Sequence, residues 1–393
     1  MLSVEPVIPG IAAIAPELIA VRRRIHAHPE LAFKETATSN LVAGLLTEWG
    51  YEVHRRLGGT GVVGVMREGE GTRRIGLRAD MDALPIEEAT GLPYASAVPK
   101  TMHACGHDGH TAMLLCAARY LAESRQFSGT LNLIFQPAEE GEGGARVMIE
   151  EGLFEQFPCD AVFGLHNMPG FAAGDMSFCP GPGMASSDRV TITVRGHGGH
   201  GAMPHLARDP MPAVASIMLG LNSIVAREVN AQQAAVVSVG SVQAGDTHNV
   251  IPQSALMKLS VRALDAGVRK LLQERITALV HAQAAAYGCE AQIDYELGYP
   301  VLVNHAEPTA FAADVAKKML GAQRVDDAAA PLMGSEDFAF MLEACPGSYA
   351  WIGNGIGSKG GCMVHNPGYD FNDDILAIGA SYWVRLAEAY LAD

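Results

Sequence analysis

The sequence lacks the features of a membrane-spanning, secreted or nucleic-acid-binding protein. No apolar run reaches the roughly 18 residues of a transmembrane helix, and no basic region precedes an apolar core at the N-terminus, so we expect neither a membrane partner nor a signal peptide. Lys and Arg together number 28, against 43 Asp and Glu, and the net charge of -15 argues against a nucleic-acid partner.

A disulfide framework is also missing, because the seven cysteines are odd in number and widely scattered. Reduced thiols of this kind are typical of a cytoplasmic protein. The sequence contains neither a Walker loop nor a G-x-S-x-G motif, and Gly353–Gly357 lacks the context of a dinucleotide-binding fingerprint. Its 393 residues are 49% hydrophobic and 18% charged, which is typical of an enzyme with a large core and more than one domain.

Apolar strands alternate with helical patterns through much of the chain. The first such run is predicted as strand, helix, strand, helix and strand over residues 74–79, 111–124, 130–136, 144–151 and 160–165. This alternation predicts the α/β class with a mostly parallel sheet. Because the pattern resumes near the C-terminus, we assign residues 1–183 and 303–393 to one domain.

The segment 184–302 has a different order of elements. Strand and helix patterns follow one another there as β-α-β-β-α-β, which predicts a ferredoxin-like α+β domain of four antiparallel strands and two helices. The glycine- and proline-rich stretch Cys179–Ser187 just before it is interpreted as a hinge or linker. We therefore expect this domain to be inserted into the α/β domain.

Acidic or imidazole groups follow the C-terminal ends of the three predicted strands. Asp80 and Asp82 follow the first strand, Glu139 and Glu140 the second, and His166 the third. Ligands of parallel sheets bind outside the carboxyl ends of the strands. These side chains are therefore expected to converge although they lie far apart in the sequence.

The stretch Met102–His110 is rich in potential metal ligands. Within it, Cys105 and His107 flank a glycine, and a thiolate and an imidazole so close together can share a divalent metal ion. A helix is predicted directly afterwards, with Asp108 as its N-cap. The alternative interpretation is an ordinary loop-to-helix junction with a buried thiol.

Five residues of the predicted α/β domain are candidate metal ligands: Cys105, His107, Glu140, His166 and His365. One thiolate, three imidazoles and one carboxylate exceed the needs of a single four-coordinate zinc ion and suit two adjacent ions. A thiolate argues against magnesium and calcium, which leaves zinc, manganese, cobalt and nickel. Each of the five could alternatively be a satisfied polar group of the core.

Acidic residues near these candidate ligands have two possible kinds of role. Glu139 could stay free beside Glu140 and act as a general base toward water, although an acidic loop with solvated charges is the alternative. Asp82, and with it Asp80, could orient a ligand imidazole or cap a turn.

The inserted domain has its own candidate site residues. His200 lies in a glycine-rich loop after a strand and could donate a hydrogen bond to a developing oxyanion. Asn249 and Arg262 could hold a substrate carboxylate, Arg262 through its planar guanidinium. The alternatives are a flexible turn at His200 and a surface charge at Arg262.

Motifs found in order through almost the whole chain resemble the family of dinuclear metal amidohydrolases. That family includes hippurate hydrolase, bacterial aminoacylase-like N-acyl-amino-acid amidohydrolases and plant auxin-conjugate hydrolases. Asp80 stands where distant relatives such as aminoacylase and carboxypeptidase G carry a metal-binding histidine, which is the usual pattern of the hippurate-hydrolase branch. The motifs lie at Arg23–Glu30, Leu77–Pro85, Met102–His110, Gln136–Glu140, Gly164–His166, Gly196–Pro204, Asn249–Pro252, Gly334–Phe338 and His365–Phe371.

The resemblance implies roles for these residues. The five candidate ligands would bind two metal ions, with Cys105 bridging them and Glu139 as the base. The inserted domain would be a dimerisation or lid domain of a homodimer or homotetramer, in which His200 reaches the site of the partner subunit. Asn249 and Arg262 would contact the substrate.

We therefore predict a metal-dependent amidohydrolase acting on a small molecule. It would cleave the amide bond of hippurate-like, N-acetyl or aryl-acyl amino acids to a carboxylic acid and a free amino acid. The rival hypotheses are a dipeptidase or carboxypeptidase of the same superfamily and a non-catalytic metal-binding or sensor protein. The presence of Glu139 beside all five candidate ligands argues against the non-catalytic protein.

Overall fold

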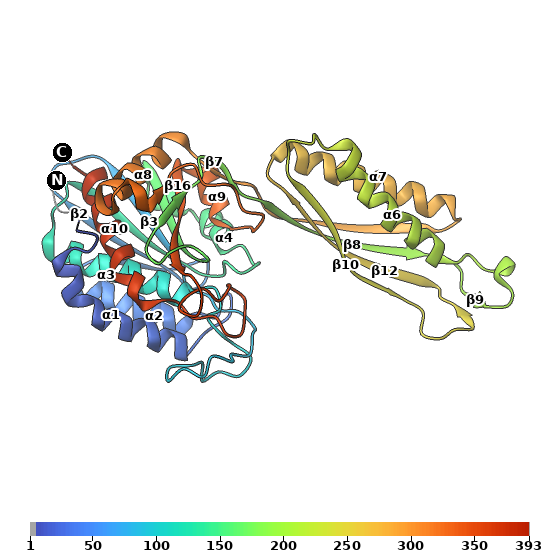
Figure 1. The fold of residues 1–393 in the computed structure, drawn as a ribbon, viewed down its shortest axis with the longest axis horizontal. Coiled ribbons are helices and arrows are strands. Elements are labelled where there is room, and N and C mark those ends of the chain that lie inside the picture. The colour runs from blue at the N-terminus through green and yellow to red at the C-terminus, as the bar shows by residue number, and fades with distance from the viewer. Residues whose placement is uncertain (1–4, 393) are drawn as a thin grey trace. The chain divides into compact units, whose positions relative to one another are not determined.

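The computed structural model describes residues 5–392, which form two compact units (Figure 1). The first unit consists of three segments: the residues up to Gly181, Val303–Ala330, and the residues from Asp337 onward. The second unit comprises Pro182–Leu302 and the short segment Pro331–Glu336. The boundary expected from the sequence assigns this short segment to the α/β domain, whereas in the structure it packs with the second unit.

An eight-stranded sheet forms the centre of the first unit, in the order β1-β2-β4-β3-β5-β16-β6-β15. The pairs β4–β3, β3–β5, β5–β16 and β6–β15 are parallel and the other three are antiparallel, so the predicted α/β class with a mainly parallel sheet is confirmed. The strand bounds are β1 Glu52–Leu57, β2 Gly61–Glu68, β3 Arg74–Asp80, β4 Gly129–Gln136, β5 Ala161–Pro169, β6 Met176–Phe178, β15 Val325–Asp326 and β16 Gly347–Gly355.

Helices cover both faces of this sheet. On one face α1, α3 and α10 pack on one another, and α2 and α8 join the same core. On the other face α4 and α9 pack together, and Phe338 of α9 lies against Arg78, which alternates along β3 with core residues such as Leu77. The helix bounds are α1 Pro9–Ala27, α2 Thr36–Glu48, α3 His107–Ser124, α4 Gly144–Glu150, α5 Leu153–Gln156, α8 Ala306–Leu320, α9 Phe338–Ala344 and α10 Leu376–Tyr390.

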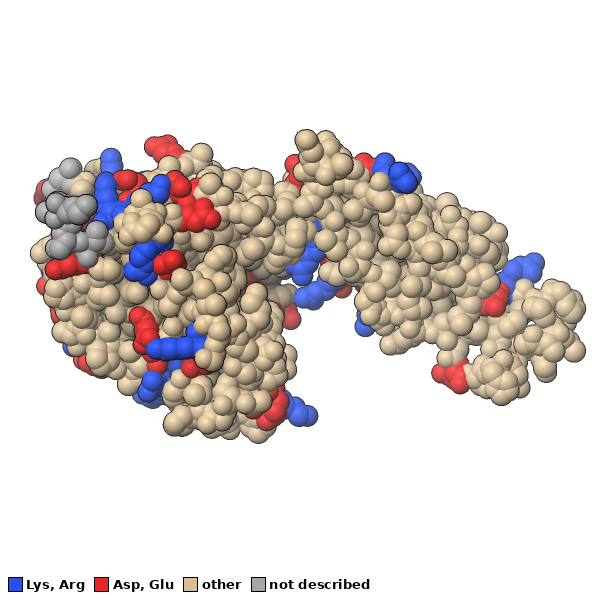
Figure 2. Space-filling model, in the orientation of Figure 1, with Lys and Arg blue, Asp and Glu red and all other residues tan. Residues whose placement is uncertain are grey.

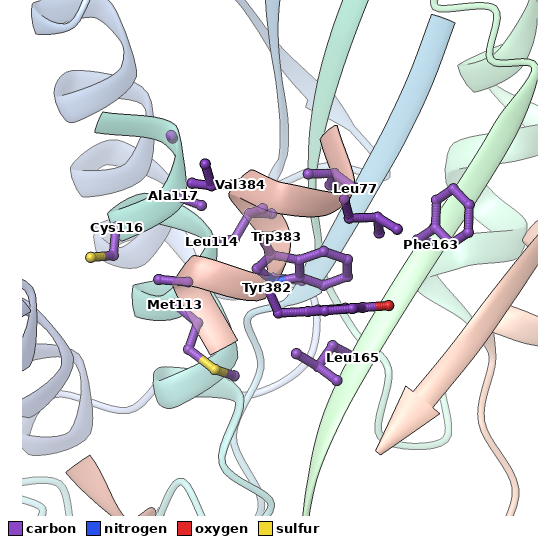
Figure 3. Packing of buried hydrophobic residues seen from close by; sticks show 14 of the residues in the cluster. Leu77, Met113, Leu114, Cys116, Ala117, Phe163, Leu165, Tyr382, Trp383 and Val384 are labelled. Atoms are coloured by element: carbon purple, nitrogen blue, oxygen red, sulfur yellow. The ribbon is translucent and has the colours of Figure 1, made fainter. Parts of the chain in front are cut away.

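The largest core holds helix α3 on the sheet. Figure 3 shows Leu114 of α3, Trp383 of α10, Leu77 of β3 and Leu165 of β5, which belong to one hydrophobic cluster. All four side chains are almost completely buried. Burying a large apolar side chain contributes roughly 1.5–3 kcal/mol, so these contacts fix the position of α3 and of His107 at its N-terminus.

The second unit has the predicted β-α-β-β-α-β order, and its sheet runs β10-β12-β8-β13 with antiparallel pairs throughout. Its helices α6 and α7 pack on this sheet around a separate hydrophobic core. Asp209 and Asp265 cap these helices, accepting hydrogen bonds from the N–H groups of Met211 and Val268. The bounds are β8 Ser186–Arg195, β9 Gly199–His200, α6 Pro210–Glu228, β10 Ala235–Ala244, β11 Val250–Ile251, β12 Ser254–Ala263, α7 Ala266–Ala286 and β13 Glu290–Tyr299.

Part of the local prediction is wrong. The boundary between the two units lies inside the stretch interpreted as a hinge or linker, Cys179–Ser187, between Gly181 and Pro182. The stretch is not irregular, however: it contains β7 (Gly181–Met184), which pairs with β14 (Leu302–Asn304), and the first residues of β8. Strands β1, β6 and β15 were not predicted. The last two are three and two residues long, too short to show a period, and β1 is largely polar with only Leu57 buried.

The cysteines, the helices and the surface charges have the following features. All seven cysteines are unpaired. Among residues 5–392, no helix is both long and apolar enough to cross a membrane. On the face that Figure 2 shows, Lys and Arg side chains lie among Asp and Glu side chains rather than in one basic field.

Candidate metal centre

Three neighbouring parallel strands deliver the predicted side chains to one edge of the sheet. Asp80 is the last residue of β3, and Glu139 and Glu140 lie in the turn that follows β4. The prediction that His166 follows its strand is wrong. Strand β5 continues to Pro169 because its pairing with β16 extends past His166.

The loop before α3 requires a glycine. Gly106 is the N-cap of the helix, with a φ of 92°. A Cβ atom there would lie 2.2 Å from Oδ1 of Asn167 and 2.5 Å from the hydroxyl of Tyr369, so no other residue fits without displacing them. The prediction of Asp108 as the N-cap is wrong. Its carboxylate is buried and lies 2.8 Å from Nε of Arg22.

The five candidate ligands converge in the first unit. Sγ of Cys105 lies 3.3 Å from Nε2 of His166, and Oε1 of Glu140 lies 3.3 Å from Nε2 of His365 and 3.9 Å from Nε2 of His107. Overlapping groups drawn from these residues have potential ligand atoms within 4.8 Å of one another. The side chains therefore surround one small region, which lies beside the solvent because His365 is 51% exposed.

The orientation of the imidazoles suits metal binding. Asp82 pairs with Nδ1 of His107 at 3.1 Å, and the other oxygen of Asp82 accepts the N–H of Glu140 at 2.9 Å. Nδ1 of His166 lies 2.6 Å from the carbonyl oxygen of Asn167. Both histidines thus present Nε2 to the site, and within the described chain the buried Nε2 of His107 makes no hydrogen bond. A metal ion would satisfy it.

The local charges point to the same ligand class. Burial raises the pKa of the Cys105 thiol well above its usual value, and the nearby Glu140 carboxylate raises it further. Burial lowers the pKa of His107, but Asp80 and Asp82 outweigh burial and raise it to about 10. Carboxylates and a thiol crowded in a buried region favour cations, which would lower the pKa of the thiol and of the imidazole.

Glu139 lies beside this ligand set. Its side chain is 7% exposed, and Oε1 accepts a hydrogen bond from the N–H of Asp337 at 3.3 Å. It belongs to a group with His107 and Glu140 in which the ligand atoms lie within 4.8 Å of one another. The Asp337 carboxylate in turn accepts from the N–H of Ala145, at the start of α4. The predicted general base is therefore held at the edge of the metal centre.

A series of buried hydrogen bonds lies behind the candidate ligands, and the sequence predicts only part of it. Nδ1 of His110 pairs with Oδ1 of Asp80 and Nε2 of His110 with Oδ1 of Asn167, each at 2.6 Å, and Asn167 donates to the hydroxyl of Tyr369 at 2.6 Å. The motifs include His110 and Tyr369, but no sequence pattern indicates that Asn167 joins them. These hydrogen bonds connect the segments that carry His107, His166 and His365.

The comparisons with known proteins agree with this geometry. Residues 76–389 match Peptidase family M20/M25/M40. The chain belongs to this family. The match covers most of the chain and both compact units. The predicted family resemblance is thus confirmed.

Several relatives of the M20 family match the chain almost end to end. It is 48% identical to a hippurate hydrolase of Campylobacter jejuni, over 98% of this chain and 99% of that protein. It is 39% identical to an N-acetyl-L-cysteine deacetylase of Bacillus subtilis, over 98% of this chain and 90% of that protein. These similarities confirm the predicted class of metal-dependent hydrolase.

A solved structure of the same family has the same fold. The YxeP protein of Bacillus subtilis, described as a dinuclear metal binding peptidase, is 34% identical, with a TM-score of 0.84 over 97% of this chain and 99% of that chain. Its dinuclear site agrees with the candidate metal-binding groups of this M20 chain.

The remaining candidates lie in the second unit of the M20 chain. His200 is exposed in β9 and pairs with Val250 of β11, and the carbonyl of Asn249 accepts the N–H of Gly201 at 2.8 Å, so His200 and Asn249 lie together. Arg262 is half-buried near the other end of β12, which begins at Ser254, and burial lowers its pKa.

Arg262 does not join the other two residues. Ser254 and Arg262 are separated by roughly 26 Å along the extended strand β12. Ser254 pairs with Arg195 at the end of β8 that leads to His200, and Arg262 pairs with Ser187 at the opposite end. The second unit therefore places His200 and Arg262 too far apart for both to contact one small amino-acid derivative.

Proposed function

We propose that this protein hydrolyses the amide bond of N-acyl amino acids, hippurate-like or with N-acetyl or aryl-acyl groups, to a carboxylic acid and a free amino acid. The observation that carries the proposal is the buried carboxylate of Glu139 beside five converging ligand side chains. The names of the M20 relatives, a hippurate hydrolase and an N-acetylcysteine deacetylase, support this substrate class.

Two divalent ions would be held by Cys105, His107, Glu140, His166 and His365. The thiol among these donors favours zinc, manganese, cobalt or nickel over magnesium and calcium. When bound, the ions would polarise the amide carbonyl and lower the pKa of water. Asp82 would keep Nε2 of His107 directed at its ion, because the carboxylate is hydrogen-bonded to Nδ1.

Glu139 would carry out the proton transfers. Its carboxylate would accept a proton from the attacking water and then return that proton to the leaving nitrogen, so that the amine departs neutral. The hydrogen bond from the N–H of Asp337 orients one oxygen of Glu139. Its 7% exposure limits competing bulk water.

Residues of the second unit would complete the site across a homodimer or homotetramer. His200 would donate a hydrogen bond to the oxygen that becomes negative during attack. Asn249 lies with His200 and far from Arg262, so Asn249 and Arg262 would contact the carboxylate of one substrate from different subunits. Because His200 and Arg262 lie at opposite ends of the second unit, they can serve one substrate together only if they come from different subunits. This separation supports a role for His200 in the partner's site.

We further infer a cytoplasmic location. The seven unpaired cysteines, several of them buried, suit a reducing compartment.

The experiment that tests the function is a substrate panel on protein reconstituted with zinc, manganese, cobalt or nickel. We expect turnover of benzoyl-glycine or acetyl-methionine and none of unblocked dipeptides. Turnover that requires a free α-amino group would instead assign a dipeptidase or carboxypeptidase. Absence of turnover across a broad acyl-amino-acid panel with every metal would favour a non-catalytic metal-binding protein.

A further inference from the structure

Glu35 is a completely buried carboxylate that none of the roles above uses. It stands at the N-cap position of α2, but its side chain does not cap that helix. Its oxygens accept hydrogen bonds from two backbone amides and one hydroxyl instead. Oε1 accepts from the N–H of Phe33 at 3.0 Å and from the N–H of Ala138 at 2.9 Å, and Oε2 accepts from the hydroxyl of Thr60 at 2.6 Å.

The two amides on Oε1 belong to strained residues. Phe33 has a φ of 59° and Ala138 a φ of 55°, both in the left-handed region. That conformation is unfavourable for a residue with a Cβ atom, because the Cβ atom comes too close to the following carbonyl oxygen. The hydrogen bonds to Glu35 offset this cost, because without Glu35 the N–H of Phe33 and the buried N–H of Ala138 would also lose their acceptor.

Ala138 directly precedes Glu139, so its conformation sets the direction in which the turn after β4 leaves the sheet. Asp82 holds the next part of the turn through the N–H of Glu140. Asp337 holds the end of the turn through the N–H of Ala145. Three carboxylates therefore accept backbone N–H groups of this turn, and Glu35 is the one at its start.

We propose that Glu35 is a positioning residue for Glu139. By accepting the N–H of Ala138 it keeps that residue left-handed, so that the Glu139 carboxylate lies where it can take a proton from water. This inference rests on the proposed function of Glu139. It places Glu35, about a hundred positions earlier in the chain, behind the general base without contact to substrate or metal.

The test compares Glu35→Ala with Glu35→Gln. The Gln side chain keeps a carbonyl oxygen for both backbone amides and turns its NH2 group to Thr60, whose hydroxyl can accept. We expect Glu35→Gln to keep kcat within about threefold of the wild type, since the hydrogen bonds that hold the turn are retained. Glu35→Ala should lower kcat per metal-loaded chain roughly tenfold or more, with KM little changed, because small misplacements of a catalytic group are costly.

A second substitution separates positioning from general stability. Ala138→Gly removes the Cβ penalty of the left-handed conformation. In the Glu35→Ala background we expect it to restore part of the lost kcat, although it adds no contact to the core. If Glu35→Ala does not fold, Glu35→Asp is measured instead. Its side chain is shorter by one methylene group, so we expect the same loss of kcat.

Two results would overturn the role of Glu35. One is wild-type kcat per bound metal in folded Glu35→Ala or Glu35→Asp. The other is an equal loss in Glu35→Gln and Glu35→Ala without rescue by Ala138→Gly. Glu139→Gln is measured in parallel. If Glu139→Gln is inactive while Glu35→Ala is unaffected, only the positioning role fails, whereas an active Glu139→Gln would refute the proposed function itself.

Discussion

Nδ1 of His107 and Oδ1 of Asp82 lie 3.1 Å apart in a fully buried hydrogen bond. The second oxygen of the same carboxylate accepts the N–H of Glu140. One side chain that lies outside the proposed ligand set therefore orients an imidazole ligand and the backbone of a carboxylate ligand. This arrangement makes Asp82 a sensitive place to test the metal centre.

Replacing Asp82 with Ala should weaken metal binding without removing a ligand. Loss of such an outer partner typically lowers metal affinity by about 10–100-fold. The affinity can be measured by competition of zinc with a chromogenic chelator. Asp314→Asn, at an exposed ion pair with Lys318 on α8, is the matched control and should leave affinity unchanged. Equal affinities for Asp82→Ala and the wild type would contradict the assignment.

Replacing Tyr369 with Phe should destabilise the protein. The change removes the hydroxyl that accepts from Asn167 and leaves a buried amide donor without its partner. An unsatisfied buried group of this kind costs about 1–3 kcal/mol. Urea unfolding of the metal-free protein measures the loss, with Tyr287→Phe on the exposed end of α7 as control. Unchanged stability would show that the hydroxyl is not needed there.

Much of this site could be predicted before the structure. The three apolar strands and the acidic or histidine residues near their ends form repeated local patterns, and the rule that parallel strands open at one edge then brings those residues together. Asp80, Glu140 and His166 follow this rule. Their neighbours Asn167 and Glu35 could not be found in this way, since their contacts join segments that only the tertiary fold brings together.

The wrong predictions have tertiary causes. Asp is a frequent residue type at the N-cap. The carboxylate of Asp108, however, pairs with the buried Arg22 and His26, and Gly106 is the N-cap instead. Here a tertiary ion pair outweighs a local preference. Strands β6 and β15 are shaped by their neighbours in the sheet rather than by a pattern of their own.

The buried pair of His26 and Asp108 should make stability depend on pH. Burial lowers the pKa of His26, but Asp108 and Glu88 outweigh burial and raise it to about 9 from a usual value of 6.5. The folded-state pKa is raised, so the stabilisation is complete below pH 6.5 and is lost as the pH rises through 9. The shift corresponds to about 3 kcal/mol at most.

The variant His26→Gln tests whether this pair makes the stability depend on pH. The difference in free energy of unfolding between the wild type and His26→Gln should be large at pH 6 and smaller at pH 10. His28→Gln, on an exposed histidine at the end of α1, should show no such change. A difference for His26→Gln that stays constant or grows toward pH 10 would contradict the charged pair.

Glu139 is proposed to transfer protons at a dinuclear metal centre. The most direct measurement is turnover of an N-acyl amino acid by Glu139→Gln, with bound metal quantified in the same sample. We expect wild-type metal content and at least about 10²-fold lower turnover, the typical contribution of general acid–base catalysis. Near-normal turnover with full metal content would contradict it.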